Sequence, residues 1–313
     1  IIMLTRQLNC SNEFWDALSS RLTMRMMMSK TLTYSRHFAN INAEENPRIH
    51  MLTSQPRSFL TNAYLIETDN ALVAVDTFMI VSDAAALLEL IVEIGKPLIA
   101  IIITHGHPDH YNGNSLLLAQ FAGIAVISTQ GITECIRDSV DAKAVKWQPF
   151  FGDDWPTEKV LPNEFVTDGS VLSLDGLSYQ FRDLGAAESS SDLYFTIGEN
   201  RAAVFVGDVV FNQMHGFMND GHSGQWLTVL DQLAQELADV DQLFTGHGEP
   251  GQPAALIALQ IDYVKAYRSE VAKQAQGATT LTPEQKTLVE TAMSQQFPEY
   301  QLTGFIQAGA DSV

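Results

Sequence analysis

Three histidines and one aspartate occupy a single short segment, Thr104-His105-Gly106-His107-Pro108-Asp109-His110. The segment follows residues 98–103, the longest apolar run of the chain. Because residues i and i+2 point the same way on the extended backbone that leaves a strand, His105 and His107 can bind one metal ion together. The proline that follows makes the chain turn, so Asp109 and His110 can address a second ion beside the first. Imidazole nitrogens combined with a carboxylate favour Zn²⁺ or a neighbouring first-row metal.

Histidine makes up only 8 of the 313 residues, so three at these offsets beside an aspartate rarely occur by chance. The segment resembles the H-x-H-x-D-H signature of the metallo-β-lactamase superfamily of metal-dependent hydrolases. The resemblance extends over roughly residues 40–275. It implies an α/β fold, a four-layer αββα sandwich whose metals lie at one edge, where loops from both sheets meet.

Two later segments fit the same resemblance. The superfamily has a metal-bridging aspartate after an apolar strand, and Asp208 follows the apolar residues 202–206. It also has a last histidine after a final strand, and His247 stands between two glycines after Leu243 and Phe244. A helix cap at Asp208 and an ordinary loop role for His247 are the alternatives. The resemblance implies that Asp109, His110 and His247 hold the second metal and that Asp208 bridges the two.

One position departs from the usual pattern. Where the superfamily places a third histidine for the first metal, after a Gly-x-x spacing, this chain has Glu188. Two histidines and a glutamate form a workable catalytic zinc site, and the alkylsulfatase branch also places carboxylates there. The added negative charge weakens the metal as a Lewis acid and favours Mn²⁺ or Fe²⁺ as alternatives. Two alternatives stay open: Glu188 in solvent beside a weakened first site, or Asp192 turned inward in its place.

Further departures separate the chain from individual branches of the superfamily. Flavin-linked di-iron relatives carry Glu in place of His107, and subclass-B1 β-lactamases carry Arg in place of His110. Alkylsulfatases of the superfamily are much longer than 313 residues. Glyoxalase-II-type thioesterases bind glutathione through basic residues of a C-terminal domain, whereas residues 279–313 contain one Lys and no Arg. None of these branches is therefore expected to be a close match.

Charge and aromatic content limit the partners. The chain has 18 Lys and Arg against 37 Asp and Glu, a net charge of −19. Such a surface repels phosphate backbones, so neither nucleic acid nor an anionic membrane is an expected partner. Few Lys or Arg lie near the motifs, and the aromatic residues between Trp147 and Trp155 are predicted to form an apolar pocket wall. The expected partner is a small-molecule substrate, a neutral or weakly charged ester, lactone or amide.

The predicted activity is that of a metal-dependent hydrolase in which two divalent ions, Zn²⁺ before Mn²⁺ or Fe²⁺, activate a hydroxide. Asp109 is expected to carry the proton of the water toward the leaving group. His215, close after the bridging aspartate, is the candidate for proton transfer or substrate binding at the rim, with a plain loop role as the alternative. The rival functions are a mononuclear iron dioxygenase of the same fold and a non-catalytic binding protein with a degenerate metal site.

Hydrophobic periodicity predicts the elements that position these residues. Strands are expected over 59–68, 71–75, 98–103, 124–128, 164–167, 171–174, 177–183, 193–197 and 202–206. Helices are expected over 11–29, 84–94, 114–121, 226–237, 254–274 and 283–295. The stretch that follows residue 128, to about residue 160, is predicted to be a long loop because its aromatic residues stand among Gly and Pro.

These elements predict three parts of the chain: an N-terminal helical arm (1–39), a metallo-β-lactamase-type domain (40–275) and a C-terminal helical extension (276–313). The methionine-rich arm packs on its own domain or docks on a second subunit to form a homodimer. Two cysteines cannot form a disulfide framework, and no apolar run approaches the ~18 residues of a membrane span. Without a recognisable signal segment, a cytoplasmic location is expected, although the chain begins with Ile rather than Met.

Overall fold

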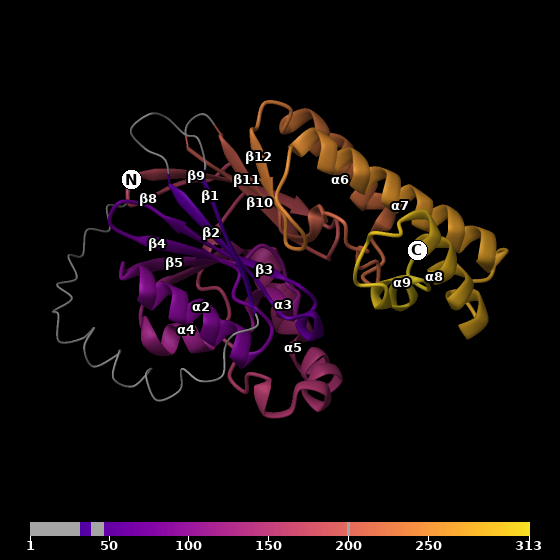
Figure 1. Ribbon diagram of the computed structural model, residues 1–313, viewed down its shortest axis with the longest axis horizontal. Helices are drawn as coiled ribbons and strands as arrows, with labels where there is room; N and C mark the ends of the chain where they lie inside the picture. Colours follow the sequence, from indigo (N-terminus) through magenta and orange to yellow (C-terminus); the bar gives the residue numbers. More distant parts are fainter. Residues whose placement is uncertain (1–31, 39–46, 199–200) are drawn as a thin grey trace.

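Two β-sheets pack face to face and carry helices on their outer faces in the computed structural model of the chain (Figure 1). The structure describes residues 32–38, 47–198 and 201–313. The four-layer αββα sandwich expected from the motifs is thus confirmed. The predicted helix over 11–29 lies outside the described residues.

The first sheet has seven strands in sequence order, β1-β2-β3-β4-β5-β6-β7. Its strands are β1 (Thr33–Phe38), β2 (Arg48–Thr53), β3 (Asn62–Glu67), β4 (Leu72–Val75), β5 (Leu98–Ile102), β6 (Ala125–Thr129) and β7 (Glu164–Val166). The strands from β1 to β4 pair antiparallel, and those from β4 to β7 pair parallel.

The second sheet has five strands in the order β12-β11-β10-β9-β8. Its strands are β8 (Val171–Leu174), β9 (Leu177–Gly185), β10 (Asp192–Ile197), β11 (Ala203–Phe205) and β12 (Gln242–Phe244). The strands from β8 to β11 pair antiparallel, whereas β11 and β12 are parallel.

Helices cover both sheets. They are α2 (Val81–Ile94), α3 (Pro108–Tyr111), α4 (Asn114–Gln120), α5 (Gln130–Phe151), α6 (Ser223–Glu236), α7 (Pro253–Ala275), α8 (Pro283–Gln296) and α9 (Gly304–Gly309). In Figure 1, α2 and α4 lie beside the first sheet, α6 and α7 lie along the second, and α8 and α9 follow beyond α7.

Large buried aromatic side chains fill the space between the sheets. Phe205 stacks on Phe195 and on Phe244 within the second sheet, at ring-centroid distances of 4.9 and 4.7 Å. Tyr64 of the first sheet meets the edges of Phe205 and Phe244, at 5.3 and 5.5 Å. Because burial of such side chains is the main favourable term in folding, this shared core holds the two sheets in one fixed relation.

The prediction of a long loop up to about residue 160 is wrong, because most of that stretch forms α5. The Thr129 side chain accepts a hydrogen bond from the amide of Ile132 and begins the helix. Ile132 and Ile136, four residues apart, are both buried, so the first turns carry a helical apolar stripe. The later turns are mostly exposed, and Pro149 stands in the last turn, which explains why the sequence reads as a loop.

Two further differences concern the ends of the chain. Residues 33–38, assigned by sequence to the N-terminal helical arm, form β1 and pair with β2. Residues of the C-terminal extension such as Val289 and Ile306 are buried in the same hydrophobic cluster as Trp226 of α6.

No helix within the described ranges combines the length and apolar character needed to cross a membrane.

Candidate metal centre

Strand ends from both sheets meet at one edge of the sandwich. Parallel β4 and β5 end beside each other, which places Asp76 next to the segment that begins at Thr104. Parallel β11 and β12 likewise place Asp208 next to His247. The polar residues that follow the apolar strands therefore converge because of strand order, although they lie far apart in sequence.

Backbone hydrogen bonds tie the two sheets together at this edge. The amide of Asn62 donates to the carbonyl of Gly246 at 2.7 Å, and the amide of Leu193 donates to the carbonyl of Thr104 at 3.1 Å. A Cβ atom on Gly246 would lie 1.8 Å from Oδ1 of Asp208. The loop after β12 can therefore pass the carboxylate of Asp208 only because residue 246 is glycine.

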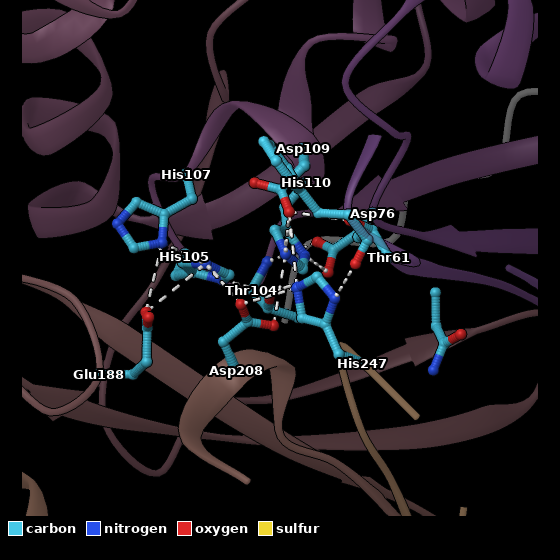
Figure 2. Close-up of polar contacts among 12 residues, drawn as sticks. Thr61, Asp76, Thr104, His105, His107, Asp109, His110, Glu188, Asp208 and His247 are labelled. Carbon is cyan, nitrogen blue, oxygen red and sulfur yellow. Dashed lines mark hydrogen bonds and ion pairs between the residues drawn. The ribbon is translucent and has the colours of Figure 1, made fainter. Parts of the chain in front are cut away.

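The first group of possible metal ligands consists of His105, His107, Glu188 and Asp208, all buried, with ligand atoms within 4.8 Å of one another. Nε2 of His105 lies 3.9 Å from Glu188 Oε2 and 3.8 Å from Asp208 Oδ2. Nδ1 of His107 lies 3.3 Å from the same Glu188 oxygen. Figure 2 shows His105 and His107 entering the site from one side, and Glu188 and Asp208 from the other.

The second group consists of Asp109, His110 and His247, which are also buried. Asp208 lies beside this group as well: its Oδ1 is 3.3 Å from Nε2 of His110, and its Oδ2 is 3.1 Å from Nε2 of His247. One carboxylate thus contacts both groups, which is the position that a bridging ligand requires (Figure 2).

Each of the four imidazole rings forms a hydrogen bond through the ring nitrogen that faces away from the site. His105 hydrogen-bonds to the Thr104 hydroxyl, His107 to Asp220, His110 to Asp76 and His247 to the carbonyl of Phe59, at 2.7–3.1 Å. The other ring nitrogen of each points toward the carboxylates. Outer hydrogen bonds of this kind fix the orientation of metal-binding histidines.

The polar atoms that face the middle of the site are suited to binding a metal ion. Nε2 of His110, both carboxylate oxygens of Glu188 and Oδ1 of Asp208 are buried and have no hydrogen-bond partner among the described residues. Buried polar atoms without a partner are rare and costly. Divalent cations would satisfy them, and the donor set of imidazole and carboxylate suits Zn²⁺, Mn²⁺ or Fe²⁺.

The electrostatics of the site agree with this fit. Burial opposes charge on His247, yet the carboxylates of Asp208 and Asp109 raise its pKa to about 9. Burial also opposes charge on Asp208, but His247 and His110 hold its pKa well below the usual range. The carboxylates of Asp208 and Asp109 are thus ionised and attract positive charge, which favours a divalent cation.

Glu188, and not Asp192, faces the histidines. Glu188 is buried, and burial raises its pKa. The Asp192 side chain instead accepts hydrogen bonds from the amides of Ala187 and Ser189, at 3.2 and 2.9 Å. Asp192 therefore shapes the loop that carries Glu188. This arrangement favours the sequence interpretation that places Glu188 in the first site.

Asp76 is a site residue that sequence reasoning missed. It follows the apolar strand β4 at a φ of 58°, just as Asp208 follows β11, and that parallel is the signal that could have found it. Its Oδ1 accepts from the Thr104 amide at 2.9 Å, and its Oδ2 hydrogen-bonds to Nδ1 of His110 at 2.7 Å. Asp76 therefore orients His110 within the second group.

Asp76→Asn should lower the affinity of the second metal roughly 10- to 100-fold, the usual cost of losing such a partner. With its oxygen on the Thr104 amide, the new side chain turns an NH₂ group toward His110 and disturbs its orientation. Metal titration against a competing chelator measures the change, with exposed Asp231→Asn on α6 as the control. Equal affinities in the two variants would contradict the role of Asp76.

The structure does not bring His215 to the metal centre. The residue is fully buried beside the hydrophobic cluster that contains Trp226 and Tyr263, and its Nδ1 lies 3.1 Å from the Tyr263 hydroxyl. Its backbone amide donates to the carbonyl of Gln301, and burial lowers its pKa to about 4. A neutral, enclosed imidazole cannot reach a substrate. His215 therefore takes no part in the mechanism proposed below, contrary to the role predicted from sequence.

A pocket opens onto the metal centre. His107, Asp109, Asp208 and His247 form part of its lining. Trp147, from the aromatic stretch predicted as a pocket wall, is among the other lining residues, which confirms that part of the prediction. Lys143 and Lys146 also line the pocket, contrary to the expectation that few basic residues lie near the motifs. They went unrecognised because residues 129–160 were predicted to be a loop.

Known proteins resemble this chain in sequence. The hydroxyacylglutathione hydrolase GloC of Haemophilus influenzae is 25% identical over 174 residues, which cover 53% of this chain and 76% of the relative. A hydroxyacylglutathione hydrolase of Aliivibrio salmonicida is 27% identical over 220 residues, or 68% of this chain and 73% of the relative.

Solved structures support the fold. A metallo-beta-lactamase from Pontibacter korlensis superposes with a TM-score of 0.54 at 14% identity, covering 74% of this chain and 99% of that one.

The family model described as the metallo-beta-lactamase superfamily matches residues 57–247, a range that contains all seven proposed metal ligands. The chain therefore belongs to the metallo-beta-lactamase superfamily.

Proposed function

We propose that this metal-dependent hydrolase uses two divalent ions, held at the shared edge of its sheets, to cleave the acyl bond of a small substrate. The observation that carries the proposal is the pair of buried ligand groups that share Asp208. Four of their inward atoms, on His110, Glu188 and Asp208, have no hydrogen-bond partner among the described residues. Each imidazole also forms a hydrogen bond on the side away from the site. Such a site is organised in advance for cations.

The proposed ligands are His105, His107 and Glu188 for one ion, and Asp109, His110 and His247 for the other, with Asp208 between them. When bound, divalent ions polarise a carbonyl and make water acidic enough to act as a nucleophile near neutral pH. Zn²⁺ is the first candidate, and Mn²⁺ or Fe²⁺ are the alternatives that the extra carboxylate favours.

Within the chain, Asp109 is the residue placed to hold a proton. It lines the pocket, and its Oδ2 accepts a hydrogen bond from the Thr61 hydroxyl at 2.8 Å. Burial would raise its pKa, but the adjacent His110 and His247 hold that pKa well below the usual range. Asp109 is thus an ionised carboxylate at the pocket floor, able to accept the proton of the attacking water and pass it toward the leaving group.

The pocket fits a small acyl compound. Aromatic side chains, among them Phe59 and Trp147, supply apolar surface beside the polar ligand atoms. Esters, thioesters, lactones and amides share the carbonyl that such a centre attacks. By their names, the curated relatives hydrolyse a hydroxyacylglutathione. Here the C-terminal extension adds Phe305, an apolar side chain, to the pocket lining.

Removal of the metals should abolish hydrolysis. We expect about two ions per chain after repletion and less than a hundredth of the rate after chelation, because both the nucleophile and the Lewis acid depend on the ions. Elemental analysis and a panel of aryl-ester, thioester, lactone, β-lactam, phosphodiester and sulfate-ester substrates test this. Fewer than one ion per chain after repletion would contradict it. Visible iron absorbance with oxygen uptake would instead indicate a dioxygenase.

A further inference from the structure

Two lysines of α5 line the pocket above the metal centre. Lys143 and Lys146 lie three residues apart in the last three turns of the helix, and Lys146 directly precedes the pocket-lining Trp147. Lys146 places its ammonium 4.7 Å from the centre of the Trp147 ring. The helix therefore presents positive charge and an aromatic face to the same cavity.

Asp220, which hydrogen-bonds to His107 at 3.1 Å, acts electrostatically on both lysines, but neither lysine forms an ion pair among the described residues. By contrast, Lys96 pairs with Glu67 and Lys286 with Asp311. Lys159 and Lys265 also form no ion pair among the described residues, so the feature that sets Lys143 and Lys146 apart is their shared position in the pocket lining. Together they bring two positive charges to the pocket of a chain whose net charge is −19.

The two lysines share their pocket with the first ligand group. Lys143, Lys146, His107 and Asp208 all line it. Burial and, next, the charge of Lys143 lower the pKa of Lys146, whereas Asp220 raises it. The two lysines therefore bring their positive charge to the pocket that His107 and Asp208 also line.

Four aromatic side chains of the lining form a continuous series of contacts. Ring contacts run from Trp147 to Phe59 at 5.2 Å, from Phe59 to Phe305 at 5.3 Å and from Phe305 to Phe217 at 5.2 Å. Phe217 in turn meets the ring of His107 at 5.5 Å. The apolar wall is thus continuous from α5 to the metal ligands, and Phe305 is the contribution of the C-terminal extension.

We propose that the substrate is an apolar acyl compound that carries one carboxylate, and that Lys143 and Lys146 bind this carboxylate. The aromatic wall receives the apolar body, and the lysines hold the anionic group away from the carboxylates of the metal centre. This inference rests on the proposed function and narrows its substrate class from a neutral compound to a monoanionic one.

A matched pair of esters tests the proposal: the phenylacetyl esters of 7-hydroxycoumarin-3-carboxylate and of its neutral 3-carboxamide. The double variant Lys143→Met/Lys146→Met should lower kcat/KM for the anionic ester about 10-fold, mainly through KM, as expected for a lost partly exposed ion pair. The neutral ester should change less than about 2-fold. Lys143→Arg/Lys146→Arg should retain the preference, and added salt should weaken it in the wild type.

The control is Lys265→Met, which removes one positive charge from an exposed position of α7, away from the pocket. Equal losses on both esters, or no loss on the anionic ester, would overturn the assignment. Binding of 7-hydroxycoumarin-3-carboxylate and its amide, followed by fluorescence anisotropy, keeps the test independent of turnover. If neither ester is cleaved but the carboxylate binds about 10-fold more weakly to the double methionine variant, the lysine site stands and the proposed hydrolysis fails.

Discussion

Asp208→Ala should release both metal ions and lower hydrolysis roughly a thousandfold or more, since the loss of several kcal/mol of transition-state stabilisation corresponds to that factor. Asp208 contacts His110 and His247 through different oxygens and also faces His105. No other described carboxylate contacts both ligand groups. Without it, the two ions would lose their common ligand and three buried imidazoles would lose a negative neighbour.

Metal content, single-turnover rate and thermal unfolding should be measured together. Asp231→Ala, on the exposed face of α6, is the matched control because it removes a carboxylate that has no part in the site. Folded Asp208→Ala protein that keeps two ions and more than a tenth of the wild-type rate would rule out a bridging role. Gly246→Ala offers a second test, because its Cβ atom would displace the same carboxylate without removing it.

Glu188→Ala should lower the metal content from about two ions to about one and reduce activity by orders of magnitude. The side chain is buried, and Oε2 lies 3.3 Å from Nδ1 of His107, yet neither oxygen has a hydrogen-bond partner among the described residues. Without the Glu188 carboxylate, the first group would keep only His105, His107 and Asp208 as possible ligands.

Two further variants make the result specific. Glu188→His should keep two ions, because imidazole and carboxylate both reach zinc at about 2.0 to 2.2 Å. Asp192→Asn should also keep two ions, since an amide oxygen can still accept from the amides of Ala187 and Ser189. If Asp192→Asn loses a metal and Glu188→Ala does not, the assignment of the first site is reversed.

The sequence predicted most of the elements and named the side chains that the structure brings together as candidate metal ligands. Four candidate ligands lie within six consecutive positions, so local geometry is enough to place them on one turn. Asp208 and His247 follow short apolar runs, and such runs identify buried strands whatever else surrounds them. Asp208 and His247, two or three residues after such runs, could therefore be identified, although Asp76, which directly follows β4, was missed. The family resemblance supplied the order in which those strand ends meet.

Only the tertiary structure decided which distant side chains meet there. Asp76 orients His110 because β4 and β5 are parallel neighbours, and this pairing is not encoded in either strand by itself. The same holds for His215, whose position beside Tyr263 removes it from the site although it lies only seven residues after Asp208. Closeness in sequence does not determine which face of a loop a side chain takes.

The pocket lining likewise depends on tertiary structure that the sequence did not reveal. Lys143 and Lys146 meet the metal centre because residues 130–151 form a helix, a state that Gly131 and Pro149 conceal from local propensity. Phe305 reaches the same pocket from the far end of the chain. A periodic pattern shows which residues share a face, but the partner of that face depends on packing between elements that are remote in sequence. For this protein, the proposed metal ligands could therefore be identified from the sequence, whereas the residues proposed to select the substrate required the fold.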